Sequence, residues 1–242
     1  MISKNRIKSI TALKLKKYRD AHGLFVVEGK KAIAEFRREG HTIRHYFTTA
    51  PAEAVHPGTE VISERTMQRI SFLKRAGSHF AVVQIPQNTP QKMGPLTVVL
   101  DAVRDPGNLG TIIRLCDWFG VPHLVCSPDT ADCYNPKAVQ ASMGSLARVR
   151  VRYTPLTTYL SKADVPVYGG FTTGKNVYAQ KLPQRAIVVL GNEGQGISAA
   201  VSKWVGHKIS IPRSGRNQRA ESLNVATATA ILLSEFKRAT EM

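Results

Sequence analysis

The chain has 242 residues, 43 % of them hydrophobic, which is enough to bury a core as one large α/β domain or two smaller ones. This composition excludes a disordered tail. The formal net charge of +17 indicates an anionic partner. Nucleic acid is favoured over a solvated basic surface or a membrane surface, because added acidic residues serve solubility better than added basic ones.

The cysteines and the N-terminal segment bear on the compartment. Three cysteines, Cys116, Cys126 and Cys133, include no Cys-x-x-Cys pair, so they indicate neither a disulfide framework nor a zinc ribbon. The basic N-terminal segment contains no apolar run of secretory length, and no other segment approaches a membrane span. We predict a cytoplasmic protein that does not bind membranes, with an organellar transit peptide as the alternative.

Residues 1 to 95 are predicted to form a small α/β domain. A helix over 4 to 19 precedes strands and helices that alternate; the strands are expected at 24 to 29, 43 to 49 and 79 to 85, and the helices at 30 to 40 and after Ser63. Residues 1 to 50 contain 12 lysines and arginines against 4 acidic residues, a local net charge of +8. We interpret this charge as an RNA-docking face, with a solvated helix face as the alternative.

A segment rich in Pro and Gln, residues 86 to 95, has no apolar periodicity and is predicted to link the first domain to a second one. The second domain, residues 96 to 242, is predicted to be α/β with a parallel sheet, because helical stretches separate most of its strands. Those strands are expected at 96 to 101, 122 to 127, 147 to 153, 166 to 171, 186 to 191 and 207 to 212.

Three loops of the second domain each follow a predicted strand, and in open α/β sheets ligands bind beyond the carboxyl ends of the strands. The first loop leads into a helix, "NLGTIIRLCDWFG", which Gly120 closes. Asn108 can cap this helix, and Arg114 lies six residues later on roughly the same face. On the alternative interpretation, Asn108 is only a cap and Arg114 only a surface ion-pair partner.

The second and third loops carry the other polar candidates. In "LGNEGQGIS", three glycines surround Glu193 and allow a ligand to approach the backbone, although a tight turn with a solvated Glu193 explains the motif equally well. The loop matches neither the dinucleotide fingerprint nor the P-loop. The third runs from "KISIP" through a basic segment into "ESLNV", where Ser222 is the expected helix cap.

Taken together and in this order, the three loops resemble the motifs of the SpoU-type, or TrmH-type, branch of the SPOUT RNA methyltransferases. The resemblance rests on "NLGTIIR", "GNEGQG" and the Ile-Pro that precedes "SLNV", and it covers residues 96 to 242. The segment "KYRDAHGLFVVEGKKAI" is also similar to the ribosomal-protein-like substrate-binding domain that many members carry.

The resemblance implies methylation of a ribose 2′-hydroxyl in RNA with S-adenosyl-L-methionine as the cofactor. It also implies a trefoil knot in the C-terminal domain and a homodimer whose active site draws on both subunits. The accessory domain favours ribosomal RNA by analogy. A tRNA 2′-O-methyltransferase and a non-catalytic RNA-binding protein of the same fold are the alternatives. Methyl transfer from a sulfonium needs no metal, so no metal site is expected.

The family's functional positions can be matched one by one. The catalytic matches are Asn108, Arg114, Glu193, Ser222 and Asn224. The cofactor-binding matches are Leu190, Gly191, Gly196, Ile211 and Leu223. The loop between Ile-Pro and Ser-Leu-Asn departs from the shorter one of many members, and we assign phosphate binding to its three arginines, Arg213, Arg216 and Arg219.

The family role of Arg114 as a base conflicts with its chemistry, because a guanidinium does not normally give up its proton in proteins. We expect Arg114 to hold the target phosphate and to stabilise the developing alkoxide. The residues do not identify the base.

Overall fold

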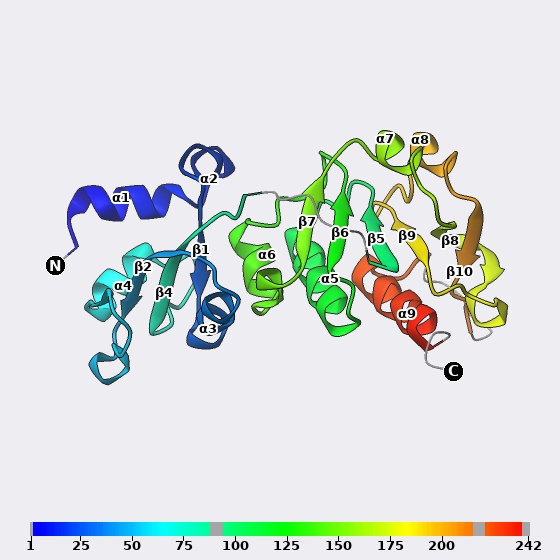
Figure 1. Ribbon diagram of the computed structural model, residues 1–242. Helices are drawn as coiled ribbons and strands as arrows, with labels where there is room; N and C mark the ends of the chain where they lie inside the picture. The colour runs from blue at the N-terminus through cyan, green and yellow to red at the C-terminus, as the bar shows by residue number, and fades with distance from the viewer. Residues whose placement is uncertain (1, 88–93, 215–220, 239–242) are drawn as a thin grey trace. The chain divides into compact units, whose positions relative to one another are not determined.

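The computed structural model describes residues 2 to 87, 94 to 214 and 221 to 238 (Figure 1). The chain forms two compact units. Unit 1 comprises Met1–Thr89 and Asp132–Ala147, and unit 2 comprises Pro90–Ala131 and Arg148–Met242. The sequence alone suggests a single boundary at residues 86 to 95, whereas in the structure a segment from the second half of the chain packs within unit 1.

Unit 1 is built on a four-stranded sheet in the order β1-β4-β2-β3, in which β4 runs antiparallel to both neighbours. Its strands are β1 (Leu24–Glu28), β2 (Ile43–Thr48), β3 (Thr59–Val61) and β4 (His79–Gln84). Its helices are α1 (Lys4–Ala12), α2 (Lys16–His22), α3 (Lys30–Arg38), α4 (Glu64–Ile70) and α6 (Pro136–Ala141), with 3₁₀ turns at η1 (Pro51–Glu53) and η2 (Ser145–Ala147). The predicted strands and the cap at Ser63 are confirmed; the short β3 is not predicted.

The prediction of one helix over residues 4 to 19 is wrong, because the chain turns between α1 and α2. Arg19 stabilises the break between the two helices. Its side chain is only 2 % exposed, and its Nη1 donates to the carbonyls of Leu13 and Lys14, each at 2.8 Å. Carbonyls at the end of a helix lack intrahelical partners, so a guanidinium that satisfies two of them stabilises the turn.

The segment from Asp132 to Ala147 is joined to unit 1 by polar and aromatic contacts. Asp132 Oδ2 accepts from Arg19 Nη2 at 2.6 Å, and the ring of Tyr134 lies 4.7 Å from that of Phe25. His41 Nε2 hydrogen-bonds the carbonyl of Ala147 at 3.0 Å. Both ends of the segment are therefore fixed to unit 1.

Unit 2 contains a six-stranded sheet in the order β10-β8-β9-β5-β6-β7, and every pairing in it is parallel. The strands are β5 (Leu96–Leu100), β6 (His123–Cys126), β7 (Arg150–Tyr153), β8 (Val167–Asn176), β9 (Ala186–Leu190) and β10 (His207–Ser210). The helices are α5 (Pro106–Trp118), α7 (Leu156–Leu160), α8 (Ala199–Ser202) and α9 (Val225–Arg238), with η3 (Val177–Ala179). The predicted parallel α/β class is confirmed.

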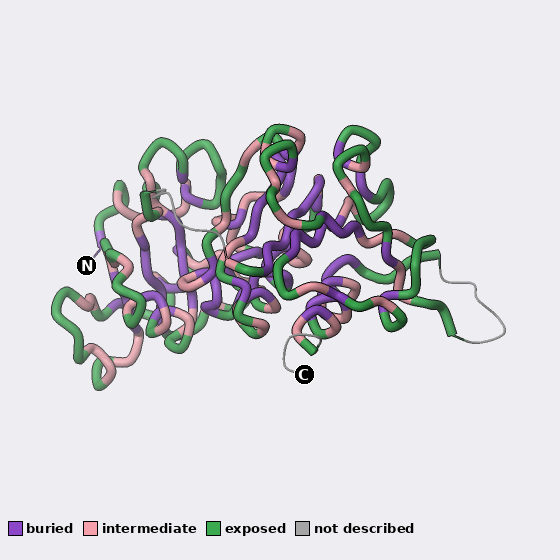
Figure 2. The backbone as a smooth tube through the Cα atoms, turned by 45° about the vertical axis from the view of Figure 1, so that its right-hand side comes forward, coloured by how far each residue is buried: buried purple, intermediate pink, exposed green. Residues whose placement is uncertain are grey.

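The sheet of unit 2 lies between two layers of helices (Figure 1). Helices α7 and α8 cover one face, over a core that includes Val99, Val125, Ile187 and Val189. Helices α5 and α9 contact each other on the opposite face. Strands β5 and β9 are buried along their whole length, as the purple tube in Figure 2 shows, which explains their continuous apolar sequences.

Parallel strands bring their carboxyl ends to the same edge of the sheet, so the loops after β5, β9 and β10 emerge together. These are the three loops that carry the predicted site residues. None of the helices within the described residues is long and apolar enough to cross a membrane. Cys116, Cys126 and Cys133 are buried and form no disulfide.

The buried ion pair between Arg19 and Asp132 generates a stability prediction. Asp132→Ala leaves the Arg19 guanidinium buried without its carboxylate, which we expect to lower the opening free energy of unit 1 by about 3 kcal/mol. Hydrogen exchange of peptides from β1 and α6, followed by mass spectrometry, measures this change. Asp20→Ala is the control, because Asp20 is 57 % exposed in its pair with Lys16 and its loss should cost less than about 0.5 kcal/mol. Equal protection in Asp132→Ala and the wild type would contradict the prediction.

Candidate functional site

The loop after β5 enters α5 through an acidic cap. Asp105 is the N-cap, and its Oδ1 accepts from the backbone N–H of Asn108 at 2.7 Å, while Pro106 occupies the first helical position. The prediction that Asn108 caps this helix is therefore wrong. Because Asp105 performs that role, the side chain of Asn108 is available for contacts with other loops.

Asn108 joins the three predicted loops through its side-chain amide. Its Nδ2 donates to Glu193 Oε1 at 2.9 Å, and its Oδ1 accepts from Asn224 Nδ2, also at 2.9 Å. Asn224 Oδ1 in turn accepts from the backbone N–H groups of Ala226 and Thr227 at 2.9 and 3.3 Å. Asn224, rather than Ser222, thus caps α9. We call Asn108, Glu193 and Asn224 the amide–carboxylate cluster.

The amide–carboxylate cluster has a defined polarity. An amide donates only through nitrogen and accepts only through oxygen, so the donation from Asn224 leaves Asn108 Nδ2 turned towards Glu193. The carboxylate of Glu193 is held through Oε1, and its Oε2 can accept a further hydrogen bond. The cluster is solvent-exposed at the carboxyl edge of the sheet, where a ligand can reach it.

The structure does not bring Arg114 and Ser222 into this cluster. Both are exposed, and within the described ranges neither makes a hydrogen bond or ion pair. At about 100° per residue, six positions rotate Arg114 some 120° from Asn108 and move it about 9 Å along the helix. The expectation that these two residues share a face is wrong. Arg114 instead shares its exposed face with Trp118, four residues later.

The loop after β9 comes extremely close to itself. A Cβ on Gly191 would lie 2.0 Å from the carbonyl carbon of Gly196, so only glycine fits at this position. Gly196 itself has φ +70°, and it exchanges two backbone hydrogen bonds of 2.9 Å with Asn192. Gly191 is therefore required for the two ends of this loop to pack backbone against backbone. Leu223, on the neighbouring loop, exposes 49 % of its surface.

Sequence reasoning missed two residues that hold this loop. Asp101 is 6 % exposed, and its Oδ2 accepts from the N–H of Ser198, the cap of α8, at 2.7 Å. Asn192 Nδ2 donates to the carbonyl of Ala102 at 2.8 Å. Asp101 directly follows a buried strand and Asn192 lies two residues beyond one, and polar residues at such positions are the signal that could have identified them.

The remaining predicted residues lie near or beyond the end of β10. Ile211 directly follows the strand and is partly buried. Arg213 is exposed, and its guanidinium donates to the carbonyl of Glu221. Arg216 and Arg219 lie outside the described residues.

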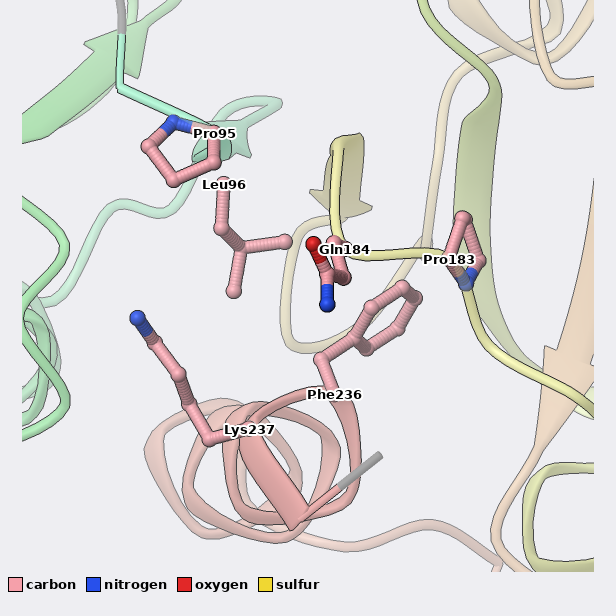
Figure 3. A pocket seen from close by; sticks show the side chains of 6 residues that line it. All are labelled: Pro95, Leu96, Pro183, Gln184, Phe236 and Lys237. Atoms are coloured by element: carbon pink, nitrogen blue, oxygen red, sulfur yellow. The ribbon is translucent and has the colours of Figure 1, made fainter. Parts of the chain in front are cut away.

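A shallow pocket lies at the opposite edge of the sheet from the amide–carboxylate cluster (Figure 3). Its lining comes from the amino end of β5, the approach to β9 and the end of α9, namely Pro95, Leu96, Pro183, Gln184, Phe236 and Lys237. No predicted site residue lines it. The convergence of polar side chains therefore identifies the candidate site better than this hollow does.

Known proteins resemble the chain along most of its length. Residues 95–234 match the SpoU rRNA Methylase family, and residues 4–81 match the MRM3-like substrate binding domain. The 23S rRNA (guanosine(2553)-2′-O)-methyltransferase RlmP of Bacillus subtilis is 31 % identical over 94 % of both chains.

Solved structures agree with these matches. A Porphyromonas gingivalis protein assigned to the TrmH family of RNA methyltransferases is 39 % identical, with a TM-score of 0.89 over 98 % of this chain and 99 % of that one. An AdoMet-bound rRNA methyltransferase from Sinorhizobium meliloti is 27 % identical, with a TM-score of 0.84 over 98 % and 97 % of the two chains. The chain belongs to the SpoU rRNA methylase family.

Proposed function

We propose that the protein transfers a methyl group from S-adenosyl-L-methionine to the 2′-hydroxyl of a ribose in ribosomal RNA. The observation that carries this proposal is the amide–carboxylate cluster, which unites side chains from all three motifs of the family. RlmP, which is similar over almost the entire chain, is named for 2′-O-methylation of a guanosine in 23S rRNA. The net charge of +17 suits an RNA substrate.

The cofactor fits the three loops at the carboxyl edge of unit 2. Leu190, Gly191, Gly196, Ile211 and Leu223 would hold it. The support is the open space beside Gly196, where an added Cβ would meet no atom within 4 Å, and the exposed Leu223, which offers an apolar surface. When bound, the cofactor supplies an electrophilic methyl carbon on a sulfonium, and this chemistry needs no metal.

The protein's own residues must orient the ribose hydroxyl and stabilise negative charge on its oxygen. Glu193, fixed by Asn108, orients a hydroxyl or amino group through its free Oε2, and Ser222 offers a further hydroxyl beside Asn224. Arg114 remains cationic and binds the RNA phosphate and the developing alkoxide. Its exposure leaves all of its donors available for this role.

We also propose a homodimer in which Arg114 completes the site of the partner subunit. Arg114 lies too far round α5 to join the amide–carboxylate cluster of its own chain. Trp118 on the same face is 82 % exposed, which is unusual for so large an aromatic side chain. An isologous contact between copies of α5 would bury both tryptophans and bring each Arg114 towards the other subunit.

Two further features of the family belong to this proposal. A trefoil knot in unit 2 is proposed from the match to the SpoU rRNA methylase family over residues 95–234. A crystal structure that traces residues 186 to 238 tests it. A cytoplasmic location is supported by the three buried cysteines, which form no disulfide and so suit a reducing compartment. Fluorescent tagging in cells tests this location.

Unit 1 presents the basic face expected to dock RNA. Strands β1 and β2 end where β4 begins, so the loops at these points share one edge of the sheet. Lys30 and Lys31 are exposed in the first turn of α3, which follows β1, and Lys74 and Arg75 are exposed on the loop before β4. The buried carboxyl of Glu28 holds the loop with Lys74 and Arg75 in place by accepting from the hydroxyl of Ser71 and the N–H of Phe72, and its burial raises its pKa.

Asn108→Asp tests the function and the amide–carboxylate cluster together. The change replaces the donor to Glu193 with a second carboxylate, so two like charges face each other and Glu193 loses its orientation. We expect transfer of labelled methyl groups to ribosomal RNA to fall by about 100-fold or more. Asn135→Asp is the control, because Asn135 only caps α6 through Oδ1.

The substrates are ribosomal RNA and transfer RNA purified from cells that lack the gene. If the wild type methylates transfer RNA alone, transfer RNA and not ribosomal RNA is the substrate. If the wild type binds RNA but methylates none, the protein is a non-catalytic RNA-binding protein. Full activity of Asn108→Asp would remove the cluster from the mechanism.

Mixed dimers test the shared site. Inactive Arg114→Ala and Glu193→Gln subunits are refolded together, so that about half of the dimers contain one of each. If Arg114 acts across the interface, each mixed dimer has one intact site, and activity should recover to about a quarter of the wild-type value. An Arg114 that serves its own subunit predicts no recovery.

The arginines of the third loop are expected to capture RNA phosphates. Replacement of Arg213, Arg216 and Arg219 by alanine should weaken RNA binding and lower the slope of log affinity against log salt by up to about three, or somewhat less on single strands. Cofactor affinity should remain close to wild type. Filter binding across a salt series measures both slopes, and superimposable lines would leave the loop without a role in RNA capture.

A further inference from the structure

The backbone at Ala102 has a conformation that a residue with a Cβ adopts at a cost. Its φ is +57°, and Met143 is the other non-glycine residue with positive φ among those described. Ala102 lies directly after Asp101, at the carboxyl edge where the candidate site is located. Such strain persists where surrounding contacts enforce it, so the contacts of Ala102 bear on the site.

Hydrogen bonds hold Ala102 on both sides. Its N–H donates to Ser127 Oγ at 2.9 Å, and its carbonyl accepts from Asn192 Nδ2 at 2.8 Å. The hydroxyl of Ser127 donates to Asp129 Oδ1 at 2.6 Å, which leaves the lone pairs of Ser127 Oγ to accept from Ala102. The left-handed backbone directs the two peptide groups of Ala102 towards these two partners.

Asn192 connects Ala102 to the glycine-rich loop after β9. While Nδ2 is bound to Ala102, Oδ1 accepts from the N–H groups of Gly194 and Gln195 at 2.9 and 3.1 Å. The backbone of Asn192 also exchanges two hydrogen bonds with Gly196. Glu193 lies inside this arrangement, so its Cα position is set by the side chain of its neighbour.

We infer that Asn192 is a positioning residue for Glu193. A loop with glycines at 191, 194 and 196 has little conformational preference of its own. The side-chain amide of Asn192 supplies that preference by binding three backbone groups. Two of them, the N–H groups of Gly194 and Gln195, lie inside the loop, and the third, the carbonyl of Ala102, lies outside it. The inference rests on the proposed function, in which Glu193 orients the reacting groups.

Asn192→Asp separates positioning from simple loss of structure. Aspartate keeps the oxygen that accepts from Gly194 and Gln195 but replaces the donor with an oxygen that repels the carbonyl of Ala102. At pH 8 we expect kcat to fall by about 10- to 100-fold, because misplacement of a site residue by about 1 Å has this effect. The Kd of S-adenosyl-L-methionine, measured by calorimetry, should change by less than about threefold, since the backbone at Gly191 remains glycine.

The pH profile gives a signature that a structural defect would not give. The carbonyl of Ala102 repels the carboxylate and accepts from the neutral O–H, so it raises the pKa of the introduced aspartic acid. Lowering the pH from 8 to 5.5 should therefore raise the ratio of variant to wild-type kcat. Ser127→Ala, which removes the acceptor for the N–H of Ala102, should lower kcat without this pH rescue. Asn135→Asp, which carries the same change of charge at a cap in unit 1, should match the wild type.

A double-mutant cycle locates the effect. If Asn192 acts through Glu193, then Asn192→Asp should cost less than about threefold in a Glu193→Gln background, measured under single-turnover conditions. Additive losses, a flat pH ratio, wild-type activity of Asn192→Asp, or failure of this variant to bind the cofactor would each overturn the inference. A wild-type protein that binds the cofactor and methylates no RNA would contradict the proposed function. Hydrogen exchange of the loop peptide then still tests whether Asn192 holds residues 192 to 196 in place.

Discussion

The hydrogen bonds made by the Asn108 amide are the interaction on which the candidate site depends. They join residues separated by 85 and 116 positions in the sequence, and the parallel sheet makes this possible by bringing the three loops to one edge. An amide suits this position because it donates to Glu193 and accepts from Asn224 at once. A carboxylate or an amine could make only one of these two contacts.

The cap at Asp105 and the cap at Asn224 allow Asn108 to play this part. Asp105 satisfies the N–H of Asn108 at the start of α5, so the side chain of Asn108 does not fold back on its own helix. Asn224 caps α9 with its oxygen and reaches Asn108 with its nitrogen. The first turns of α5 and α9 are thereby connected through Asn108 to the carboxylate of Glu193. The orientation of Glu193 thus depends on which residues cap these two helices.

Two unusual backbone features of unit 2, at Gly191 and Ala102, also lie at the carboxyl edge of the sheet. Gly191 permits a contact with the backbone of Gly196 that any side chain would prevent, and Ala102 accepts a left-handed conformation that presents its carbonyl to Asn192. Unit 1 solves a different problem with buried charge. The guanidinium of Arg19 donates to the carbonyls of Leu13 and Lys14 between α1 and α2, and it also binds Asp132. One side chain therefore stabilises the break between the two helices and holds the segment that begins at Asp132 in unit 1.

By itself, the sequence determined the elements, because strands such as β5 and β9 are continuous apolar runs and local caps such as Ser63 and Ser198 act within a few residues. Through their motifs it also placed Glu193 after the strand β9 and Asn224 before the last helix. Tertiary structure alone decided that Asn108 bridges them and that α1 and α2 are separate helices. It also decided that the segment from Asp132 to Ala147 packs in unit 1. Each of these outcomes depends on a contact between distant residues, or on which of two neighbours caps a helix, and neither leaves a periodic signal in the sequence.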